Sequence, residues 1–462
     1  MKTNEPDNFE MYDRSHRFAE VVQATGSGAI RLSLTIDREI AGTETAQLIA
    51  LAICNILPRI SERYTTIDLC IPNQAVRVPR IHWQGTLQEY LLTELNAVCP
   101  WGTFRAVERL IEVYDHCIVV GSTTPLSAKH VVYALASGWR CFVSETASPV
   151  LPAMAFNPSS CLATAAVACM FVYRQAEKIQ SWVQQPEING WSLLTYKESP
   201  HDGPNLPQEL NIHEVRQAGV GGTGNALLWA MRHGPDLIGR WIAFEHEAAD
   251  ATNWNRYMLL NFNDAAQGKT KAEVAAQAFE KIHPGLKFGV MPGRVEDFYH
   301  DFRRAAVVLA TVDDPKVRVD LQPYSRNVLL NVGTNSQCLS ISVHETQKVI
   351  NGNACIGCLY GQNGQAERRQ RESTVSFVLG LVGAVLSGEF IKSYAFPEHL
   401  LSNSWGANIF YPASAKIVQA EKVPQCSICT LVGKMNRDVS PVKKPIHIAL
   451  QTEAPGTTNE AN

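Results

Sequence analysis

The chain has 462 residues, 45% of them hydrophobic, and its 41 Lys and Arg residues against 44 Asp and Glu residues leave a formal net charge of −3. This length allows two domains or one large domain with a substantial core. The balanced charge and ordinary apolar content argue against a disordered chain and against a broad nucleic-acid surface. The polar N-terminus lacks the apolar segment of a secretory signal, so we expect a cytoplasmic protein without a membrane anchor.

The first part of the chain predicts an α/β half. An apolar strand over residues 116–120 leads into a turn at Gly121, and a helix is predicted over residues 128–137. A second strand over residues 139–143 precedes the acid Glu145. A similar order of glycine turn, helix, strand and acid recurs later with more charged residues. We therefore interpret this part as a degenerate copy of the later half, and a generic second α/β domain is the alternative.

Two apolar stretches are long enough to require a check against membrane insertion. Residues 160–173 are too short to cross a bilayer, and residues 374–393 contain Ser376, Ser387 and Glu389. Both stretches follow a polar start of similar character. We predict that both are buried core helices, one in each half.

The glycine pattern at residues 219–224, Gly-Val-Gly-Gly-Thr-Gly, is the most informative feature of the chain. A strand is predicted before it and a helix over residues 226–231 after it. Such a turn aims backbone N–H groups and a helix N-terminus at phosphate. The acid Glu245 ends the next apolar run, where it can accept hydrogen bonds from ribose hydroxyls. These features alone also fit an NAD or FAD enzyme. The glycines that would hold the phosphates are Gly219, Gly221, Gly222 and Gly224.

Polar and charged residues after the acid favour a nucleotide triphosphate over a dinucleotide. Asn253 and Arg256 are three residues apart, so a helical turn points them the same way. Lys269 follows a glycine turn and can reach the same place. A triphosphate needs these cations because its charge must be neutralised for attack at phosphorus. Asp313 follows a predicted strand over residues 306–312 and is placed to hold Mg²⁺.

The second part of the chain predicts a mainly parallel sheet covered by helices. Short apolar strands alternate with helical segments or turns, which is typical of a parallel α/β arrangement. Residues 362–372 predict an exposed polar loop. The strands are predicted over residues 241–244, 287–291, 306–312, 327–332 and 338–343, with a helix over residues 271–282.

Four cysteines form two Cys-x-x-Cys pairs, Cys355 with Cys358 and Cys426 with Cys429. Four thiolates are the ligand set of a closed tetrahedral Zn²⁺ site, which would tie two distant segments together. The role would be structural because no ligand position is left for water. Two unrelated pairs, one of them redox-active, are the alternative.

Four spaced motifs in the second half resemble the adenylation domain of ubiquitin-activating enzymes and of their bacterial relatives in the ThiF/MoeB superfamily. The motifs are residues 219–224, 252–257, 268–275 and 311–314, and the cysteine pairs follow in the same order as in that family. The resemblance implies a Rossmann-like α/β adenylation domain. It also implies ATP and Mg²⁺ as cofactors, with a structural Zn²⁺ ion.

The resemblance implies a role for each matching residue. The glycines would hold the ATP phosphates, and Asn253, Arg256 and Lys269 would contact them. Asp313 would bind Mg²⁺, and Glu245 stands where the family has Asp at the ribose. Tyr257 replaces the usual Gln, which is a second departure. Residues 11–14 resemble the N-terminal motif whose arginine, Arg14 here, reaches the γ-phosphate across the dimer or pseudo-dimer.

The resulting hypothesis is a bacterial, two-half activating enzyme for a ubiquitin-like protein, of the kind found in antiviral-defence conjugation pathways. It would adenylate the partner's C-terminal carboxylate for transfer to a conjugating enzyme. The rivals are a sulfur-carrier adenylyltransferase, a nicotinamide or flavin oxidoreductase and a scaffold without turnover. The expected organisation is an intrachain pseudo-dimer, with a homodimer left open. Its parts are a degenerate half (1–196), a linker (197–207), an active domain with the zinc site (208–439) and a flexible tail (440–462).

A thioester on the enzyme's own cysteine has little support in the sequence. The connection over residues 359–374, where relatives carry such a cysteine, contains none. Cys338 is the nearest remaining candidate, but it begins an apolar run and is expected to lie in the core. We therefore predict direct transfer of the activated carboxylate to a cysteine on a partner.

Overall fold

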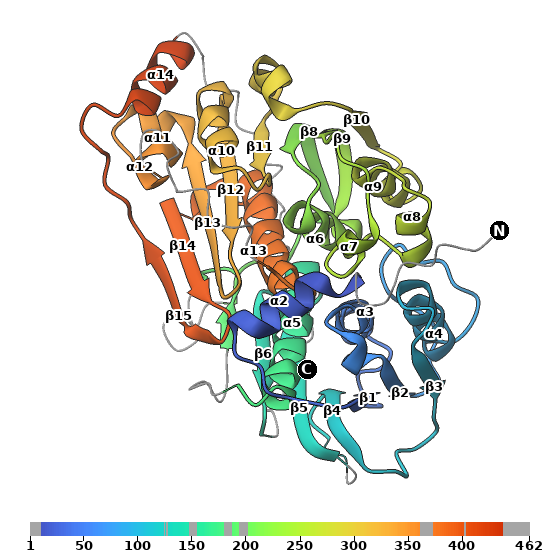
Figure 1. Ribbon diagram of the computed structural model, residues 1–462. Helices are drawn as coiled ribbons and strands as arrows, with labels where there is room; N and C mark the ends of the chain where they lie inside the picture. Colours follow the sequence, from blue (N-terminus) through green and yellow to red (C-terminus); the bar gives the residue numbers. More distant parts are fainter. Residues whose placement is uncertain are drawn as a thin grey trace, which may run out of the picture.

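The computed structural model shows a mixed α/β protein built on two sheets (Figure 1). The first sheet lies at the bottom of Figure 1 and the second occupies its upper part. The expected loop over residues 362–372, the tail over residues 440–462 and residues 197–201 of the linker lie outside the described residues. Described are residues 11–123, 125, 128–146, 155–179, 187–193, 202–360, 373–401 and 403–437.

The first sheet has seven strands in the order β3-β2-β1-β4-β5-β6-β7. The first five in this order are parallel, and β6 and β7 add antiparallel strands at one edge. Its strands are β1 (Arg31–Ile36), β2 (Thr66–Cys70), β3 (Thr103–Ala106), β4 (Tyr114–Val120), β5 (Ala128–Ser137), β6 (Arg140–Ser144) and β7 (Glu187–Asn189).

The second sheet has eight strands in the order β10-β9-β8-β11-β12-β13-β14-β15. Again the first five are parallel and the remaining strands are antiparallel. Its strands are β8 (Glu209–Ala218), β9 (Asp236–Phe244), β10 (Leu286–Met291), β11 (Val307–Ala310), β12 (Val328–Thr334), β13 (Cys338–Glu345), β14 (Asn403–Asn408) and β15 (Tyr411–Val418).

The two sheets repeat one topology. Each strand of the first sheet has its counterpart at the same position of the second, from β3 and β10 to β7 and β14. The strand order reverses beside β1 in the first sheet and beside β8 in the second, as in Rossmann-like folds. The prediction of a Rossmann-like α/β half preceded by a related half is therefore confirmed.

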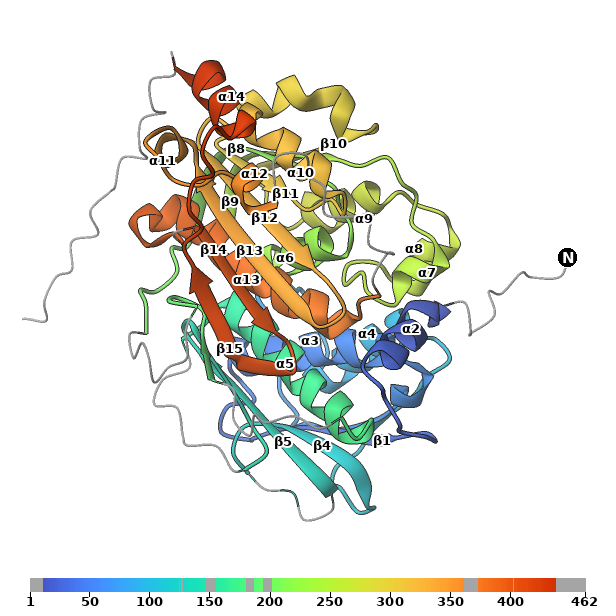
Figure 2. The same cartoon turned by 60° about the vertical axis from the view of Figure 1, so that its left-hand side comes forward.

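Helices from both halves pack together between the sheets (Figures 1 and 2). The long helices α5 and α13, which the sequence predicted as corresponding core helices, contact each other and the inner faces of their own sheets. The helices are α2 (Asp13–Val21), α3 (Glu44–Ile56), α4 (Leu87–Val98), α5 (Pro158–Ala176), α6 (Gly222–Arg232), α7 (Ala251–Trp254), α8 (Phe262–Ala266), α9 (Lys271–Glu280), α10 (Pro315–Leu321), α11 (Thr346–Ile350), α12 (Ile356–Tyr360), α13 (Ser376–Ala395) and α14 (Ser427–Asn436), with short 3-10 turns η1 (Leu57–Arg59), η2 (Glu62–Tyr64), η3 (Val295–Arg304), η4 (Gln322–Tyr324) and η5 (Pro397–His399).

Helix α13 crosses its neighbours at close range. A Cβ atom added at Gly383 would lie 2.5 Å from Cβ of Ala226 on α6, and one at Gly380 would lie 3.3 Å from Cβ of Ala166 on α5. The hydroxyl oxygens of Ser159 and Ser387 lie 2.7 Å apart in the same buried layer. Among the described residues α13 is the one helix long and apolar enough to cross a membrane, and 94% of its most apolar window is buried inside the protein.

Two predictions for the first half are wrong. Residues 128–137, expected as a helix, form β5. The run contains Val131, Val132 and Tyr133, residue types that favour strands, and the central strand is buried, so no alternation marks it. The turn at Gly121 follows β4, which corresponds to β11 and not to β8. The proposed match between this turn and the later glycine pattern therefore placed the two halves out of register.

Candidate functional site

The glycine pattern forms the turn between β8 and α6, as predicted. Gly219 has a φ of +82°, a left-handed conformation that glycine adopts without strain, and its N–H donates to the Phe244 carbonyl at 2.9 Å. Gly221 is the N-cap residue of α6. A Cβ atom at Gly224 would lie 2.4 Å from the side-chain nitrogen of Gln217. The turn therefore requires glycine for both its conformation and its close packing.

Buried polar side chains hold the glycine turn in place through hydrogen bonds to its backbone. The Thr311 hydroxyl, at the end of β11, donates to the Gly219 carbonyl at 2.5 Å. The amide nitrogen of Gln217 donates to the same carbonyl at 3.0 Å, and its oxygen accepts from the Trp241 indole at 3.0 Å. This network joins β8, β9 and β11 under the glycines, so the turn is held in place before any ligand binds.

Glu245 lies at the end of β9, as predicted, and its carboxylate faces the turn. One oxygen accepts the N–H of Val220 at 2.9 Å, and the other accepts the N–H groups of His246 and Glu247, both at 3.0 Å. The carboxylate is buried and thus braces the glycine turn against the following loop. Its role at a ribose stays a prediction.

Residues 251–260, called the arm here, carry the predicted phosphate contacts. Asn253 lies in a capping box with Asp250 at the start of α7. The Arg256 guanidinium donates to the Thr252 carbonyl and to Oδ1 of Asn255, the latter at 3.0 Å. It also lies 5.3 Å from the centre of the Tyr257 ring.

The arm is tied to the glycine turn through Tyr257 and Leu259. The Tyr257 hydroxyl would lie 3.7 Å from a Cβ atom at Gly221, and the Leu259 N–H donates to Oδ1 of Asn225 on α6 at 2.7 Å. The structure therefore places Tyr257, whose ring lies beside the Arg256 guanidinium, against the glycine turn, although the two segments are distant in sequence. Tyr257, noted in the sequence only as a departure, lines the turn itself.

Two lysines at the start of α9 occupy different environments. Lys269 pairs with Asp264 and is half-buried. Lys271 is buried, pairs with Glu247 and lies 5.5 Å from the centre of the Tyr257 ring. Of the two, Lys271 is the one that lies over Tyr257, the residue next to the glycine turn, and sequence reasoning missed it. The signal was available, because the capping pair Thr270 and Glu273 places Lys271 at the first helical position.

Asp313 lies just beyond β11, beside the glycine turn. Its neighbour Val312 approaches Gly219 closely, since a Cβ atom at Gly219 would lie 2.9 Å from Cγ1 of Val312. Asp314 caps α10 by accepting the Lys316 N–H at 2.7 Å. Asp313 is exposed, and none of the described residues forms a hydrogen bond or ion pair with it. Such a carboxylate is free to bind a cation.

The N-terminal segment with Arg14 packs beside the arm (Figure 2). The rings of Tyr12 and Trp254 lie 5.4 Å apart, and Asn255 donates to the Ser15 hydroxyl at 3.3 Å. Arg14 is therefore close to the arm of the other half, as its proposed role requires. The contact of Arg14 with a nucleotide stays a prediction.

The corresponding turn of the first half, after β1, holds a carboxylate instead of glycines. The side chain of Asp37 accepts the N–H groups of Ser122 and Thr123 at 2.6 and 3.1 Å. An added Cβ atom at Gly121 would lie 2.2 Å from this carboxylate. A negative charge at this point repels phosphate, which gives a physical reason why this half would not bind a nucleotide.

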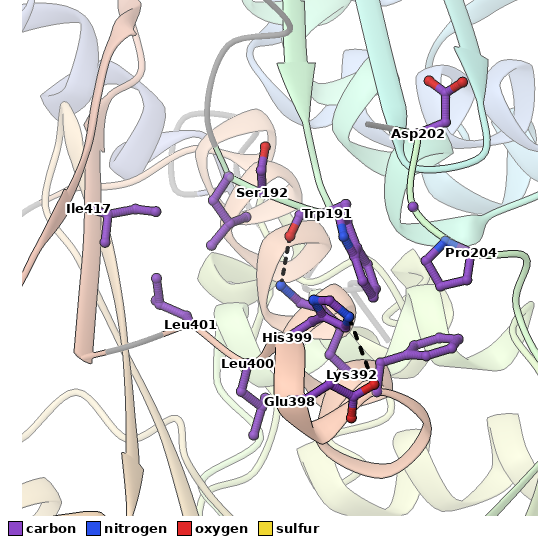
Figure 3. A pocket seen from close by; sticks show the side chains of 13 residues that line it. Trp191, Ser192, Asp202, Pro204, Lys392, Glu398, His399, Leu400, Leu401 and Ile417 are labelled. Carbon is purple, nitrogen blue, oxygen red and sulfur yellow. Dashed lines mark hydrogen bonds and ion pairs between the residues drawn. The ribbon is translucent and has the colours of Figure 1, made fainter. Parts of the chain in front are cut away.

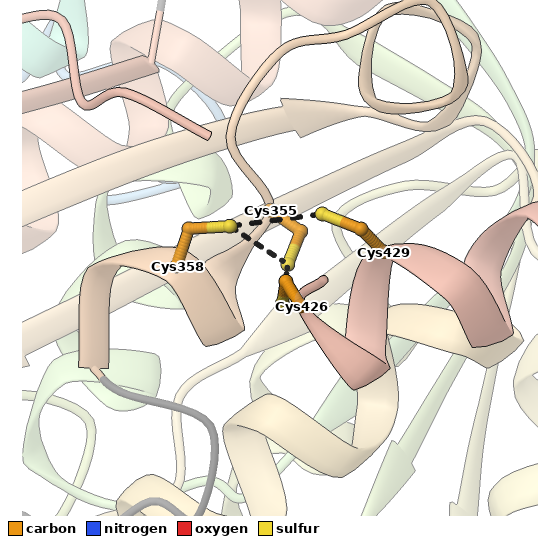
Figure 4. A group of neighbouring side chains, drawn as sticks. All are labelled: Cys355, Cys358, Cys426 and Cys429. Atoms are coloured by element: carbon orange, nitrogen blue, oxygen red, sulfur yellow. Dashed lines mark hydrogen bonds between the residues drawn. The ribbon is translucent and has the colours of Figure 1, made fainter. Parts of the chain in front are cut away.

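The four paired cysteines come together, as predicted (Figure 4). All four sulfur atoms lie within 4.8 Å of one another, and three of the sulfur–sulfur distances are 3.6 to 3.7 Å. A tetrahedral ion with Zn–S bonds of about 2.3 Å places its sulfurs about 3.8 Å apart, so the group fits Zn²⁺. Hydrogen bonding from the Cys355 thiol lowers the pKa of Cys429, which favours the thiolate that binds metal.

Cys338 is exposed, so the expectation that it lies in the core is wrong. It is the first residue of β13, where the strand leaves a turn closed by Asn335, whose Oδ1 accepts the Cys338 N–H at 2.5 Å. Because side chains alternate along a strand, the following Leu339 takes the buried position.

A cavity of about 950 Å³ lies at the C-terminal end of α13 (Figure 3). Its lining includes Lys392 and Phe396 at the C-terminal end of α13, whereas Leu379 at the N-terminal end of that helix meets Gly222. The buried Lys392 pairs with Glu389 and donates to the Trp191 carbonyl at 3.0 Å. The cavity is therefore separate from the predicted nucleotide site.

Comparisons with known proteins match parts of this chain. A curated relative, the uncharacterized protein y4jF of Sinorhizobium fredii (strain NBRC 101917 / NGR234), is 28% identical over 260 residues, 54% of this chain and 48% of that protein. The chain thus spans about half the length of this relative. Structures of E. coli MccB with ATP and with MccA match at a TM-score of 0.39, with 19% and 20% identity, over 47% of this chain and 66% of MccB.

A family model covers the second half. Residues 207–428 match the ThiF family, and this range holds the glycine turn, the arm, Asp313 and three of the paired cysteines. This segment, just under half of the 462 residues, is therefore similar to the ThiF family.

Proposed function

We propose that this protein activates a ubiquitin-like protein by adenylating its C-terminal carboxylate with ATP. The observation that carries the proposal is the position of Asp313 beside the glycine turn at the N-terminus of α6, where its exposed carboxylate has no hydrogen-bond or ion-pair partner in the described part of the chain. A helix N-terminus attracts phosphate and a free carboxylate attracts a divalent cation, so the two together suit a metal-bound triphosphate. The ThiF family match supports the same reaction class.

The residues of the site would bind different parts of the metal–nucleotide complex according to their charge. The N–H groups of the glycine turn would bind the phosphates, and Arg256, Lys271 and Lys269 are the cations available to neutralise them. Asp313 fits Mg²⁺ as one oxygen ligand, with water and phosphate oxygens supplying the rest. Bound there, Mg²⁺ would withdraw charge from the phosphate oxygens.

The reaction needs alignment more than acid–base chemistry. One oxygen of the substrate carboxylate attacks the α-phosphorus of ATP, and the bond from that phosphorus to the pyrophosphate oxygen breaks. The products are acyl-AMP and pyrophosphate, and no proton has to be removed. In our proposal the acyl group then passes to a cysteine of a conjugating-type partner, in a bacterial conjugation pathway.

Exchange of labelled pyrophosphate into ATP, in the presence of candidate ubiquitin-like proteins, tests the proposal. We expect exchange with wild-type protein and a loss of about a hundredfold or more in Asp313→Asn, because the metal ligand is removed. Asp314→Asn is the matched control, since asparagine also caps a helix. Mass spectrometry should detect the acyl-adenylate. Equal exchange in Asp313→Asn and wild type would refute the site as drawn, and nucleotide binding without exchange with any candidate would favour a scaffold.

A further inference from the structure

The first half reaches across the molecule to the arm of the second half. Tyr12 packs against Trp254, and the Trp254 indole donates to the Val98 carbonyl at 2.6 Å. Two further contacts to the arm are buried hydrogen bonds. Asn55 at the end of α3 donates one to the Met258 carbonyl, and Arg59 in η1 donates one to the Leu260 carbonyl. Because the arm carries Arg256 and Tyr257, whatever fixes the arm also fixes two residues at the glycine turn.

Arg59 binds both ends of the segment that contains Arg256 and Tyr257. Its side chain is fully buried, with 0% exposed. One terminal nitrogen donates to the Trp254 carbonyl, and the other donates to the Leu260 carbonyl at 2.8 Å. The guanidinium also lies 5.5 Å from the centre of the Trp254 ring. The planar guanidinium, whose donor directions are fixed, thus connects the two ends of the segment from Trp254 to Leu260 in the arm.

Asn55 binds the same segment at a third point. Its amide nitrogen donates to the Met258 carbonyl at 3.0 Å, while its own Oδ1 and backbone oxygen accept from Nε of Arg59 at 3.2 and 3.0 Å. The two side chains, four residues apart, therefore satisfy three carbonyls of the arm. A buried carbonyl left without a donor is unfavourable, so these three hydrogen bonds hold the arm in this conformation.

The Arg59 guanidinium donates to carbonyl and side-chain amide oxygens, and none of the described residues offers it a carboxylate as a hydrogen-bond or ion-pair partner. Burial lowers the pKa of Arg59 to about 9, which still leaves it charged at neutral pH. A buried charged group whose acceptors are uncharged oxygens holds the arm in shape rather than forming an ion pair.

We propose that Arg59, assisted by Asn55, is a positioning residue for nucleotide binding: it fixes the arm so that Arg256 and Tyr257 face the glycine turn. This inference rests on the proposed function. It gives the first half, whose own turn holds Asp37, a defined task at the site of the second half.

Steady-state kinetics of pyrophosphate exchange test the proposal with the full chain. We expect Arg59→Met to raise the KM for ATP about tenfold or more, with a smaller change in kcat, because a displaced arm misplaces Arg256. Arg59→Lys, which keeps the charge but not the fork, should recover part of the loss. Arg63→Met is the matched control, since Arg63 binds Glu177 and the Gly28 carbonyl within the first half.

A double-mutant cycle separates positioning from a general loss of stability. If Arg59 acts through Arg256, adding Arg59→Met to Arg256→Ala should raise the KM for ATP little further. A rise of the same size in both backgrounds would overturn the proposal. So would an unchanged KM for ATP in folded Arg59→Met. If Arg59→Met does not fold, Asn55→Ala provides the same test with a smaller expected rise, because it removes the side-chain contacts to Met258 and to Nε of Arg59 but leaves the two Arg59 contacts to the arm.

Amide hydrogen exchange gives a readout that does not depend on the reaction. Peptides covering residues 254–260 should exchange faster in Arg59→Met than in wild type, while Arg63→Met leaves them unchanged. Unchanged protection of these peptides in Arg59→Met would refute the positioning role. If wild-type protein shows no pyrophosphate exchange at all, the proposed function fails, and the amide measurement alone decides what Arg59 does to the arm.

Discussion

Lys269 and Lys271 are two residues apart, yet the fold gives them different surroundings. Burial lowers the pKa of Lys271, but the neighbouring Tyr257, Glu247 and Glu245 outweigh that effect and raise it above its ordinary value. Lys271 therefore stays protonated at neutral pH while buried against the turn. Lys269 forms an ion pair with Asp264 at the edge of the site. The geometry favours Lys271 as the stronger contact for a phosphate.

Replacing each lysine by methionine tests this ranking. We expect Lys271→Met to lower kcat/KM for pyrophosphate exchange about a hundredfold, because a preorganised cation is lost from a partly dry site. Lys269→Met should cost clearly less. The exchange rates of both variants, with their melting temperatures measured in parallel, decide the matter, and a larger loss in Lys269→Met would reverse the assignment.

Glycine has opposite consequences at two helical positions. A Cβ atom at Gly224 would meet Gln217, the Gly219 carbonyl and the Thr311 hydroxyl at 2.4 to 2.8 Å, whereas one at Gly433 in α14 meets nothing within 4 Å. We expect Gly224→Ala to destabilise the protein by about 1–3 kcal/mol and to disrupt the turn. Gly433→Ala should stabilise it by up to about 1 kcal/mol through helix propensity. Chemical denaturation measures both, and equal effects would contradict the packing described here.

At the scale of elements, the cysteine group joins two short helices that have few other ties. Cys355 and Cys358 flank the start of α12, and Cys426 and Cys429 lie at the start of α14. Helix α14 then rests on η4, where Asn436 donates to the Pro323 carbonyl at 3.2 Å. A metal ion at this point would hold the outer layer of the second sheet together.

We expect one Zn²⁺ ion per chain, measured by elemental analysis of protein purified without chelator. Cys426→Ser should lose the metal and lower the free energy of unfolding by at least about 3 kcal/mol, because the fold then lacks a cross-link between distant segments. Cys70→Ser, a half-buried cysteine outside the group, is the control. Zinc-free wild-type protein of full stability would contradict the assignment.

The whole molecule has one continuous core across both halves. A single hydrophobic cluster includes Leu34 and Ile56 of the first half together with Leu227 and Val382 of the second. The helical layer that contains α5 and α13 is shared, because each of these helices packs on its own sheet and on the helix of the other half. Separate unfolding of the halves would expose this layer to water.

A bulky residue at the α13–α5 crossing tests this view. Gly380→Leu should push α13 away from Ala166 and Ile56 and lower the stability of both halves together, by about 1–3 kcal/mol. Calorimetry should show a single transition displaced to lower temperature. Gly388→Ala, where the nearest atom would lie at 3.4 Å, is the control. Two transitions, of which only one moves, would show that the halves unfold independently.

Several elements of the second half and the groups at its glycine turn could be predicted from the sequence alone. The glycine pattern, the short apolar strands and the paired cysteines are local signals, because each depends on spacing within a few residues. Residues 271–282 and 307–310 were predicted in the right class for this reason. The same local reading missed β5, since an apolar run of Val and Ala fits a buried strand and a buried helix alike.

Only the tertiary structure decided which side chains share a site. Lys271 rather than Lys269 contacts Tyr257, Cys338 is exposed, and Asp37 occupies the first half's turn, and none of these facts follows from spacing along the chain. Each depends on segments far apart in sequence that the two sheets bring together. Arg59 is the clearest case, because a buried arginine has no local signature and gains its meaning from carbonyls some two hundred residues away. Contacts of this kind are set by packing, which a single sequence does not reveal.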